Sequence, residues 1–140
     1  MKCQRCQYDD AEWAAQDIAG DLQIATLGSH ERGFRMLKIC ADCAAEIRAD
    51  AEPLERFRSA YRAWARTRQT RRPPELISHI EYHVLSRCEY YQFPDPIRDR
   101  LMVEHMVERE LLHYNQATQK LELTHIARKA LRAFEKKTNP

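Results

Sequence analysis

Two Cys-x-x-Cys pairs constrain the fold of this 140-residue chain more than any other feature of its sequence. Cys3 pairs with Cys6 and Cys40 with Cys43, which accounts for four of the five cysteines. Two intervening residues allow both thiolates of a pair to turn toward one tetrahedral ion, and a second pair from a distant segment completes the coordination shell. We therefore predict that these four cysteines bind one structural zinc ion, Zn2+.

A shell of four thiolates leaves no coordination position for water, so the ion is not expected to be catalytic. His30 is an alternative ligand, but four cysteines suffice, and a loop histidine is usually solvated. The remaining Cys88 lies in a segment of helical apolar periodicity. We expect it to be an ordinary buried thiol rather than a reactive one.

The segment between the two pairs is predicted to form short strands at residues 12–18, 22–26 and 34–39. Turns are expected at Gly20-Asp21 and at residues 28–33. A helix is predicted at residues 44–48, with Cys43 in its first turn, where backbone amides favour a thiolate. The expected order is therefore a cysteine loop, a hairpin, a second cysteine loop and a helix.

Met-Lys-Cys-Gln-Arg-Cys at the start and Ile-Cys-Ala-Asp-Cys-Ala-Ala-Glu-Ile further on resemble the treble-clef or zinc-ribbon modules of small bacterial and phage regulators. The resemblance covers residues 1–50 and implies the metal and the fold. Such modules occur in DNA-binding, RNA-binding and protein-binding contexts. The resemblance therefore leaves the partner open.

Basic residues concentrate in one part of a chain whose formal net charge is only +2. A helix is predicted from Pro53, because proline is compatible with a first helical turn and apolar residues follow at spacings of three and four. No acid occurs between Glu55 and Glu75. The arginines of this stretch are Arg56, Arg58, Arg62, Arg66, Arg68, Arg71 and Arg72.

This cluster has three interpretations. Guanidinium groups pair well with phosphate oxygens, so the helix is a candidate nucleic-acid-binding element. A docking site for an acidic protein surface and a simple solvated face are the alternatives. Arg71-Arg72-Pro73-Pro74 predicts the end of the helix and a linker. We thus divide the chain into a zinc module at 1–50, an arginine-rich helical connector at 51–74 and a C-terminal domain at 75–140.

In the C-terminal domain, a helix is predicted from Glu75 to the Phe93-Pro94-Asp95-Pro96 segment, and a second helical stretch, broken or unbroken, at residues 97–113. Alternation around a polar turn predicts a hairpin at 114–124, after which Thr124 caps a final helix. The final helix is expected to carry apolar residues on one side and basic residues on the other.

This order, together with the residues at 110–114, 120–124 and 127–131, resembles a winged-helix domain. The sequence differs from the common pattern at Glu110 and Ala127, where glycine is usual. The resemblance implies that the helix before the wing enters the DNA major groove. Here that helix carries Glu104, Glu108 and Glu110, which phosphates would repel, so we expect this domain to mediate protein contact or homodimerisation.

Several other activities find no support in the sequence. Motifs for binding phosphates or dinucleotides, and the nucleophile elbow of hydrolases, are absent, so an enzyme is not expected. His79 and His83 have metal-compatible spacing, but the glutamate of a metalloprotease motif is missing, and a structural role is favoured. No apolar run is long enough to span a bilayer, and the start lacks the features of a signal peptide. We expect a soluble, cytoplasmic protein.

The sequence thus favours a mainly helical fold with small β-hairpins, formed by a treble-clef zinc module, a helical connector and a winged-helix-like domain. The leading functional hypothesis is a zinc-stabilised, non-enzymatic regulator that binds nucleic acid through its arginine-rich helix, with transcription as the candidate process. The alternative is a protein-binding adaptor or inhibitor, of phage or mobile-element type, that does not bind nucleic acid.

Overall fold

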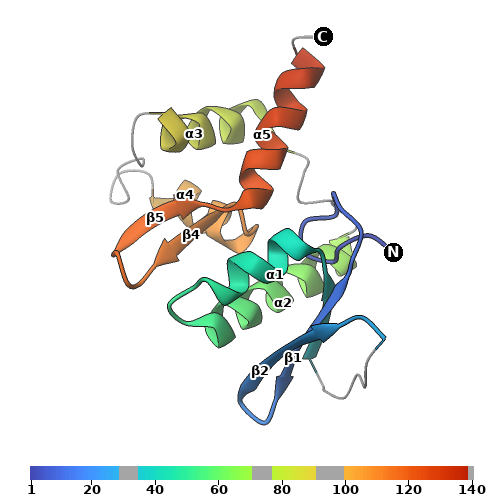
Figure 1. Ribbon diagram of the computed structural model, residues 1–140. Coiled ribbons are helices and arrows are strands. Elements are labelled where there is room, and N and C mark those ends of the chain that lie inside the picture. The colour runs from blue at the N-terminus through green and yellow to red at the C-terminus, as the bar shows by residue number, and fades with distance from the viewer. Residues whose placement is uncertain (29–34, 71–76, 91–99, 139–140) are drawn as a thin grey trace. The chain divides into compact units, whose positions relative to one another are not determined.

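The computed structural model describes residues 1–28, 35–70, 77–90 and 100–138. The chain divides into two compact units, Met1–Arg71 and Arg72–Pro140, and each is described by itself. The described residues form five helices and two small antiparallel sheets, one of three strands and one of two (Figure 1). The described residues are therefore of mixed α/β type. The predicted helices and small hairpins are present, whereas a mainly helical fold was expected.

The first unit contains the three-stranded sheet. Its strands are β1 (Trp13–Ile18), β2 (Asp21–Thr26) and β3 (Arg35–Ile39), and β1 lies between the other two. All pairings are antiparallel, with Ala15 opposite Ile24 on one side and Leu37 on the other. The predicted strands are confirmed, with shifts of one residue at the starts of β1 and β2. Phe34, where the third strand was expected to begin, lies outside the described residues.

The turn between β1 and β2 consists of Ala19 and Gly20, one residue earlier than expected, since Ile18 already pairs with Asp21. Both turn residues have positive φ angles, 53° and 87°. These values are typical of a type I′ turn, whose twist matches that of the flanking strands. The Gly20 N–H also donates a hydrogen bond to a side-chain oxygen of Asp17, at 3.1 Å.

Two helices complete the first unit. Helix α1 (Ala41–Arg48) begins at the second cysteine pair, and α2 (Pro53–Thr70) begins at the proline that the sequence indicated. Phe57 of α2 is fully buried, as are Leu37, Ile39 and Ile47. Because α2 packs against α1, β2 and β3, this part of the arginine-rich segment belongs to the core of the first unit.

The second unit contains α3 (His79–Tyr90), α4 (Arg100–Glu108), β4 (Leu112–Asn115), β5 (Lys120–Leu123) and α5 (His125–Thr138). Strands β4 and β5 form the predicted hairpin, and Thr124 precedes the final helix as expected. The fully buried side chains of this unit include Leu85, Met106, Leu111 and Ile126. They come from all three helices and from the residue that precedes the hairpin, so the unit has a core of its own.

Helix α3 begins at His79 rather than at Glu75, because Ile77 and Ser78 are not helical. The Ser78 hydroxyl accepts a hydrogen bond from the Glu81 N–H, at 3.2 Å, and the Glu81 carboxylate accepts one from the Ser78 N–H, at 2.9 Å. This reciprocal pair is a capping box, which fixes a helix start. The expected linker at 71–74, the first two residues of the predicted helix and the stop at 93–96 lie outside the described residues.

The predicted helical stretch at 97–113 was wrong beyond Glu108, since Leu112 and His113 belong to β4. Glu110 has a φ of 61°, its N–H bonds to the Val107 carbonyl at 3.0 Å, and the Leu111 N–H bonds to the Met106 carbonyl at 2.9 Å. This is the hydrogen-bond pattern of a Schellman motif, which terminates helices. The left-handed residue is a glutamate here, so no glycine marks the end of the helix.

Candidate metal centre

The four cysteines of the two pairs come together in the first unit. Their four Sγ atoms all lie within 4.8 Å of one another, and all four residues are buried. The Sγ atoms of Cys3 and Cys43 are 3.5 Å apart, and those of Cys6 and Cys40 are 3.6 Å apart. Around a tetrahedral ion with metal–sulfur bonds of about 2.3 Å, the sulfurs would be separated by about 3.8 Å. The cluster has the dimensions of a metal site, and all four cysteines are free of disulfides.

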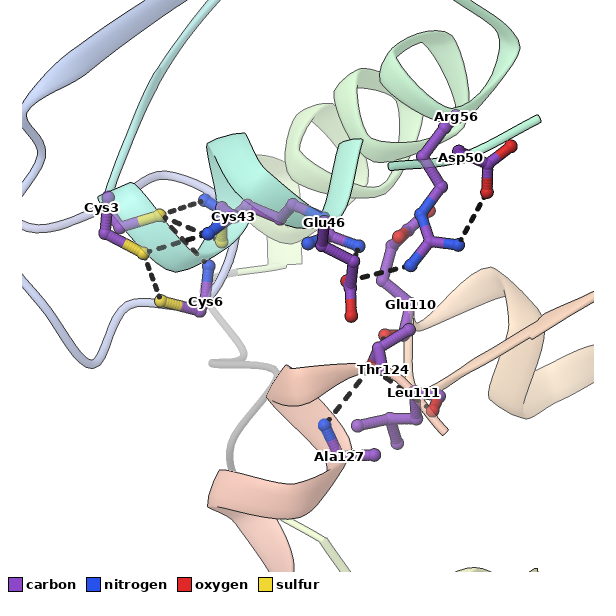
Figure 2. Close-up of polar contacts among 12 residues, drawn as sticks. Cys3, Cys6, Cys43, Glu46, Asp50, Arg56, Glu110, Leu111, Thr124 and Ala127 are labelled. Atoms are coloured by element: carbon purple, nitrogen blue, oxygen red, sulfur yellow. Dashed lines mark hydrogen bonds and ion pairs between the residues drawn. The ribbon is translucent and has the colours of Figure 1, made fainter. Parts of the chain in front are cut away.

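Backbone N–H groups point at the sulfurs of both pairs (Figure 2). The N–H groups of Arg5 and Cys6 donate to the Cys3 sulfur, at 3.4 and 3.5 Å. Cys40 occupies the N-cap of α1, and its sulfur accepts from the Cys43 N–H at 3.5 Å. Such donors stabilise a negatively charged sulfur, which is the form that binds metal.

Gln4, inside the first cysteine pair, links the two pairs. Its N–H donates to the Lys38 carbonyl at 2.8 Å, and its side-chain oxygen accepts from the Lys38 N–H at 3.0 Å. Lys38 lies two residues before Cys40, near the end of β3. The first cysteine loop is therefore hydrogen-bonded to the strand that leads into the second.

The pKa values of the thiols differ because the four sulfurs are close together and buried. Hydrogen bonding with Cys40 and Cys43 lowers the pKa of Cys3 to about 6. The pKa of Cys40 is raised, mainly by its hydrogen bond with Cys3, and burial raises the pKa of Cys43. Without a cation the cluster thus favours one thiolate among protonated neighbours. A divalent cation supplies the charge that four thiolates require, so the donor set fits a metal ion.

A buried group of charged residues lies beside the cysteines. Glu46 of α1 forms an ion pair with Arg5, at 2.6 Å. It also pairs with Arg56 of α2 at 2.8 Å, and Arg56 pairs with Asp50 at 3.1 Å (Figure 2). The side chains of Arg5 and Arg56 are only 1% and 5% exposed. These ion pairs join the first cysteine loop, α1 and α2. Sequence analysis missed Arg5 and Glu46, since neither stands in a recognisable charge pattern.

Of the seven arginines of the predicted nucleic-acid-binding cluster, the structure describes four side chains, and their surroundings differ. Arg56 is buried, and Arg58 pairs with Asp17 at 3.3 Å and more loosely with Glu55 at 3.8 Å. Arg62 is 57% exposed and lies 3.6 Å from Glu55, and Arg66 is exposed. The Arg68 side chain, Arg71 and Arg72 lie outside the described part of the chain.

His79 and His83 do not belong to the metal-capable group of the described residues. The His79 ring packs edge-on against Phe134, with ring centroids 5.0 Å apart, and the His83 ring contacts Tyr82 at 5.8 Å. Among the described residues, the four cysteines form the only group of three or more metal-capable side chains. His30 lies outside those residues.

Cys88, in α3, is not a member of the metal-capable group. Burial raises its pKa to about 11, so its thiol is protonated at neutral pH. A protonated thiol is a poor nucleophile, which agrees with the expectation of an unreactive cysteine.

Comparison of the chain with family models, curated proteins and solved structures gave no match. In the described part of the chain, no helix has both the length and the apolar character needed to cross a membrane. The class that the structure itself defines is that of a mixed α/β protein with a buried four-cysteine cluster able to hold one metal ion.

Proposed function

We propose that the cysteine cluster holds one structural zinc ion and that the protein is a non-enzymatic regulator that binds nucleic acid. Four sulfur donors suit zinc, and they close its tetrahedral shell against substrate or water. The order of cysteine loop, strands, cysteine loop and α1 supports the treble-clef resemblance. In the second unit, the sequence of helices, hairpin and α5 supports the winged-helix resemblance, as does the left-handed Glu110 at a position where glycine is usual.

The observation that carries nucleic-acid binding is the exposure of Arg62 and Arg66, four residues apart on α2. This spacing places both guanidinium groups on one side of the helix, and Arg68, Arg71 and Arg72 follow in the sequence. Arginine pairs with phosphate oxygens through two parallel hydrogen bonds. We leave Arg56 out of the proposed surface, because its guanidinium is buried against acids.

Binding to random duplex DNA and to structured RNA over a salt series tests this assignment. Changing Arg62, Arg66 and Arg71 to Ala should weaken binding and reduce the slope of log K against log salt by up to about 3, since each phosphate contact contributes about 0.9. Arg35→Ala, an exposed arginine on β3, is the control and should change the slope little. An unchanged slope in the triple variant would exclude α2 as the binding element.

The zinc assignment is tested by Cys40→Ser. Ligation of structural zinc contributes on the order of 10 kcal/mol to folding, so this variant should lose the ion and the fold of the first unit. Native mass spectrometry measures the metal content. The control is Cys88→Ser, which changes a cysteine of the second unit and should keep one zinc ion per chain. Stoichiometric zinc in Cys40→Ser would refute the four-cysteine site.

A protein-binding adaptor or inhibitor is the second candidate, and a groove in the second unit favours it. This groove, of about 590 Å³, lies between α4 and the β4–β5 hairpin, with Val103, Val107 and Leu121 among its apolar walls. Glu104 and Glu108 also line it and would repel phosphates. Absence of nucleic-acid binding even at low salt would favour this candidate.

A further inference from the structure

Helix α5 carries a row of cations along its exposed side. Arg128, Arg132 and Lys136 are all exposed and recur every fourth residue. At a rise of about 1.5 Å per residue, they start from backbone positions about 6 Å apart along one side of the helix. In total, α5 contains five cations and one acid, a formal balance of +5 − 1 = +4. We call Arg128, Arg132 and Lys136 the α5 row.

Packing within the second unit fixes which side of α5 faces solvent. Ile126, Ala130 and Leu131 are buried, and the Phe134 ring stacks on Tyr82 of α3 with centroids 4.5 Å apart. The only acid of α5, Glu135, accepts a hydrogen bond from the Tyr82 hydroxyl at 3.2 Å. The acid is thus held toward α3, and the α5 row keeps a single sign of charge.

The α5 row also differs from the arginines of α2 in its partners. Arg56 and Arg58 of α2 are engaged by acids from other elements of the first unit. Within the described part of the chain, no acid lies within ion-pair distance of the side chains of the α5 row. Its three charges are therefore available to an external anion.

Helix stability does not account for the whole row. Cations in the last turn of a helix are favoured by the helix dipole, which explains Lys136. Arg128 ends the first turn, where the dipole disfavours a cation and where α5 has no acid. Its presence there is better explained by an external partner than by the helix itself.

We propose that the α5 row is a second phosphate-contacting surface for nucleic acid, separate from Arg62 and Arg66 on α2. Equal charges at regular intervals suit a backbone of regularly spaced phosphates, and such contacts position a protein without reading sequence. Glu104 and Glu108 make α4 unfavourable for phosphates, so α5 is the helix of this unit suited to them. This inference rests on nucleic acid as the partner, but not on α2 as the contact.

The test uses the zinc-loaded full chain and random duplex DNA over a salt series. The variant changes Arg128, Arg132 and Lys136 to Gln, which removes three charges while keeping long side chains with good helix propensity. If all three contact phosphates, the slope of log K against log salt should fall by about 2.7. The matched control changes Lys2, Arg35 and Arg100 to Gln, an equal loss of exposed charge elsewhere, and circular dichroism verifies that both variants are folded.

Each outcome decides between the two surfaces. A reduced slope in the α5 variant, with the control unchanged, supports the α5 row whatever the α2 variant does. A reduced slope in the α2 variant alone overturns the α5 row and leaves the proposed function intact. Equal losses in the α5 variant and the control overturn the α5 row, because they would reflect net charge only. Failure of the unaltered protein to bind either duplex DNA or structured RNA at low salt, or binding to polyglutamate instead, overturns both surfaces.

Discussion

Thr124 connects the end of α4 to the start of α5 through both functions of its hydroxyl. The hydroxyl donates to the Glu110 carbonyl at 2.6 Å and accepts from the Ala127 N–H at 3.2 Å, and the residue is fully buried (Figure 2). Sequence analysis predicted the helix cap. It did not predict the bond to Glu110, because pairing of β4 with β5 is what brings these distant residues together.

Thr124→Val should lower the free energy of unfolding of the second unit by about 2 kcal/mol, since it removes a helix cap and leaves a buried carbonyl without this donor. Thr124→Ser keeps the hydroxyl, so it should lower the free energy of unfolding clearly less than Thr124→Val does. Urea denaturation followed by far-ultraviolet circular dichroism measures both. Equal stability of the valine variant and the unaltered protein would show that the hydroxyl contributes nothing.

Ala19 occupies a left-handed position that a residue with Cβ and no polar group tolerates poorly. Ala19→Asn should raise the stability of the first unit by about 0.5–1 kcal/mol, because asparagine is preferred in type I′ turns. Ala25→Asn, at the last but one residue of β2, is the control and should lower stability. Tryptophan fluorescence during denaturation reports both changes, and a destabilised Ala19→Asn would contradict the turn type.

At the scale of elements, helix and strand ends depend on hydrogen bonds that the sequence shows only in part. Ser78-His79-Ile80-Glu81 has the Ser-x-x-Glu spacing of a capping box, which indicates a helix start at this point. The prolines at 73–74 indicated an earlier start, and the structure agrees with the capping box. The end of α4 had no such signal, since Glu110 is an unusual residue for the left-handed conformation. The strands of the first unit were predictable because alternation and glycines marked them.

Glu81 joins the start of α3 to Arg109, just beyond the end of α4, and its acidity follows from these contacts. Burial alone would raise the pKa of its carboxyl group, but hydrogen bonds from Ser78 and Arg109 outweigh burial and lower the pKa below 4.5. Because the folded-state pKa is the lower one, the ionised carboxylate stabilises the fold above the unfolded-state pKa. This contribution is lost as the pH falls through the folded-state pKa.

Glu81→Gln should therefore cost about 2 kcal/mol of unfolding free energy at neutral pH, the usual contribution of hydrogen bonds to a buried charged group. The difference between the variant and the unaltered protein should shrink as the pH falls below about 4.5. Denaturation series at several pH values measure this, with the more exposed Glu104→Gln as control. A difference that is independent of pH would show that the charge of Glu81 does not stabilise the fold.

For the whole molecule, the cysteine cluster was predictable because metal ligation imposes a local spacing that the sequence displays. Which arginines are buried or paired with acids was not predictable in this way. Arg58 pairs with Asp17, and Arg56 pairs with Glu46 and Asp50, acids that lie outside the arginine-rich segment and approach it only through folding. A run of like charges in the sequence therefore overstated the exposed charge of α2.

Metal removal should affect the two units differently, since each has its own core. Both tryptophans of the chain, Trp13 and Trp64, lie in the first unit, so their fluorescence reports that unit alone. Chelation should shift this emission toward that of exposed indole, while the helical circular dichroism of the second unit persists. Zinc should restore the emission, whereas an emission insensitive to chelation would argue against a structural ion.

The ion pairs of Glu46 also determine where the chain can be cut. A fragment that ends at residue 50 would retain all four cysteines, but it would lose Arg56, one of the two guanidinium partners of Glu46, and Phe57 from the core. Burying a carboxylate with half of its partners, beside an exposed apolar surface, is unfavourable. The shortest autonomously folding fragment is therefore expected to extend through α2, and limited proteolysis of the metal-loaded protein should yield a resistant product that includes this helix.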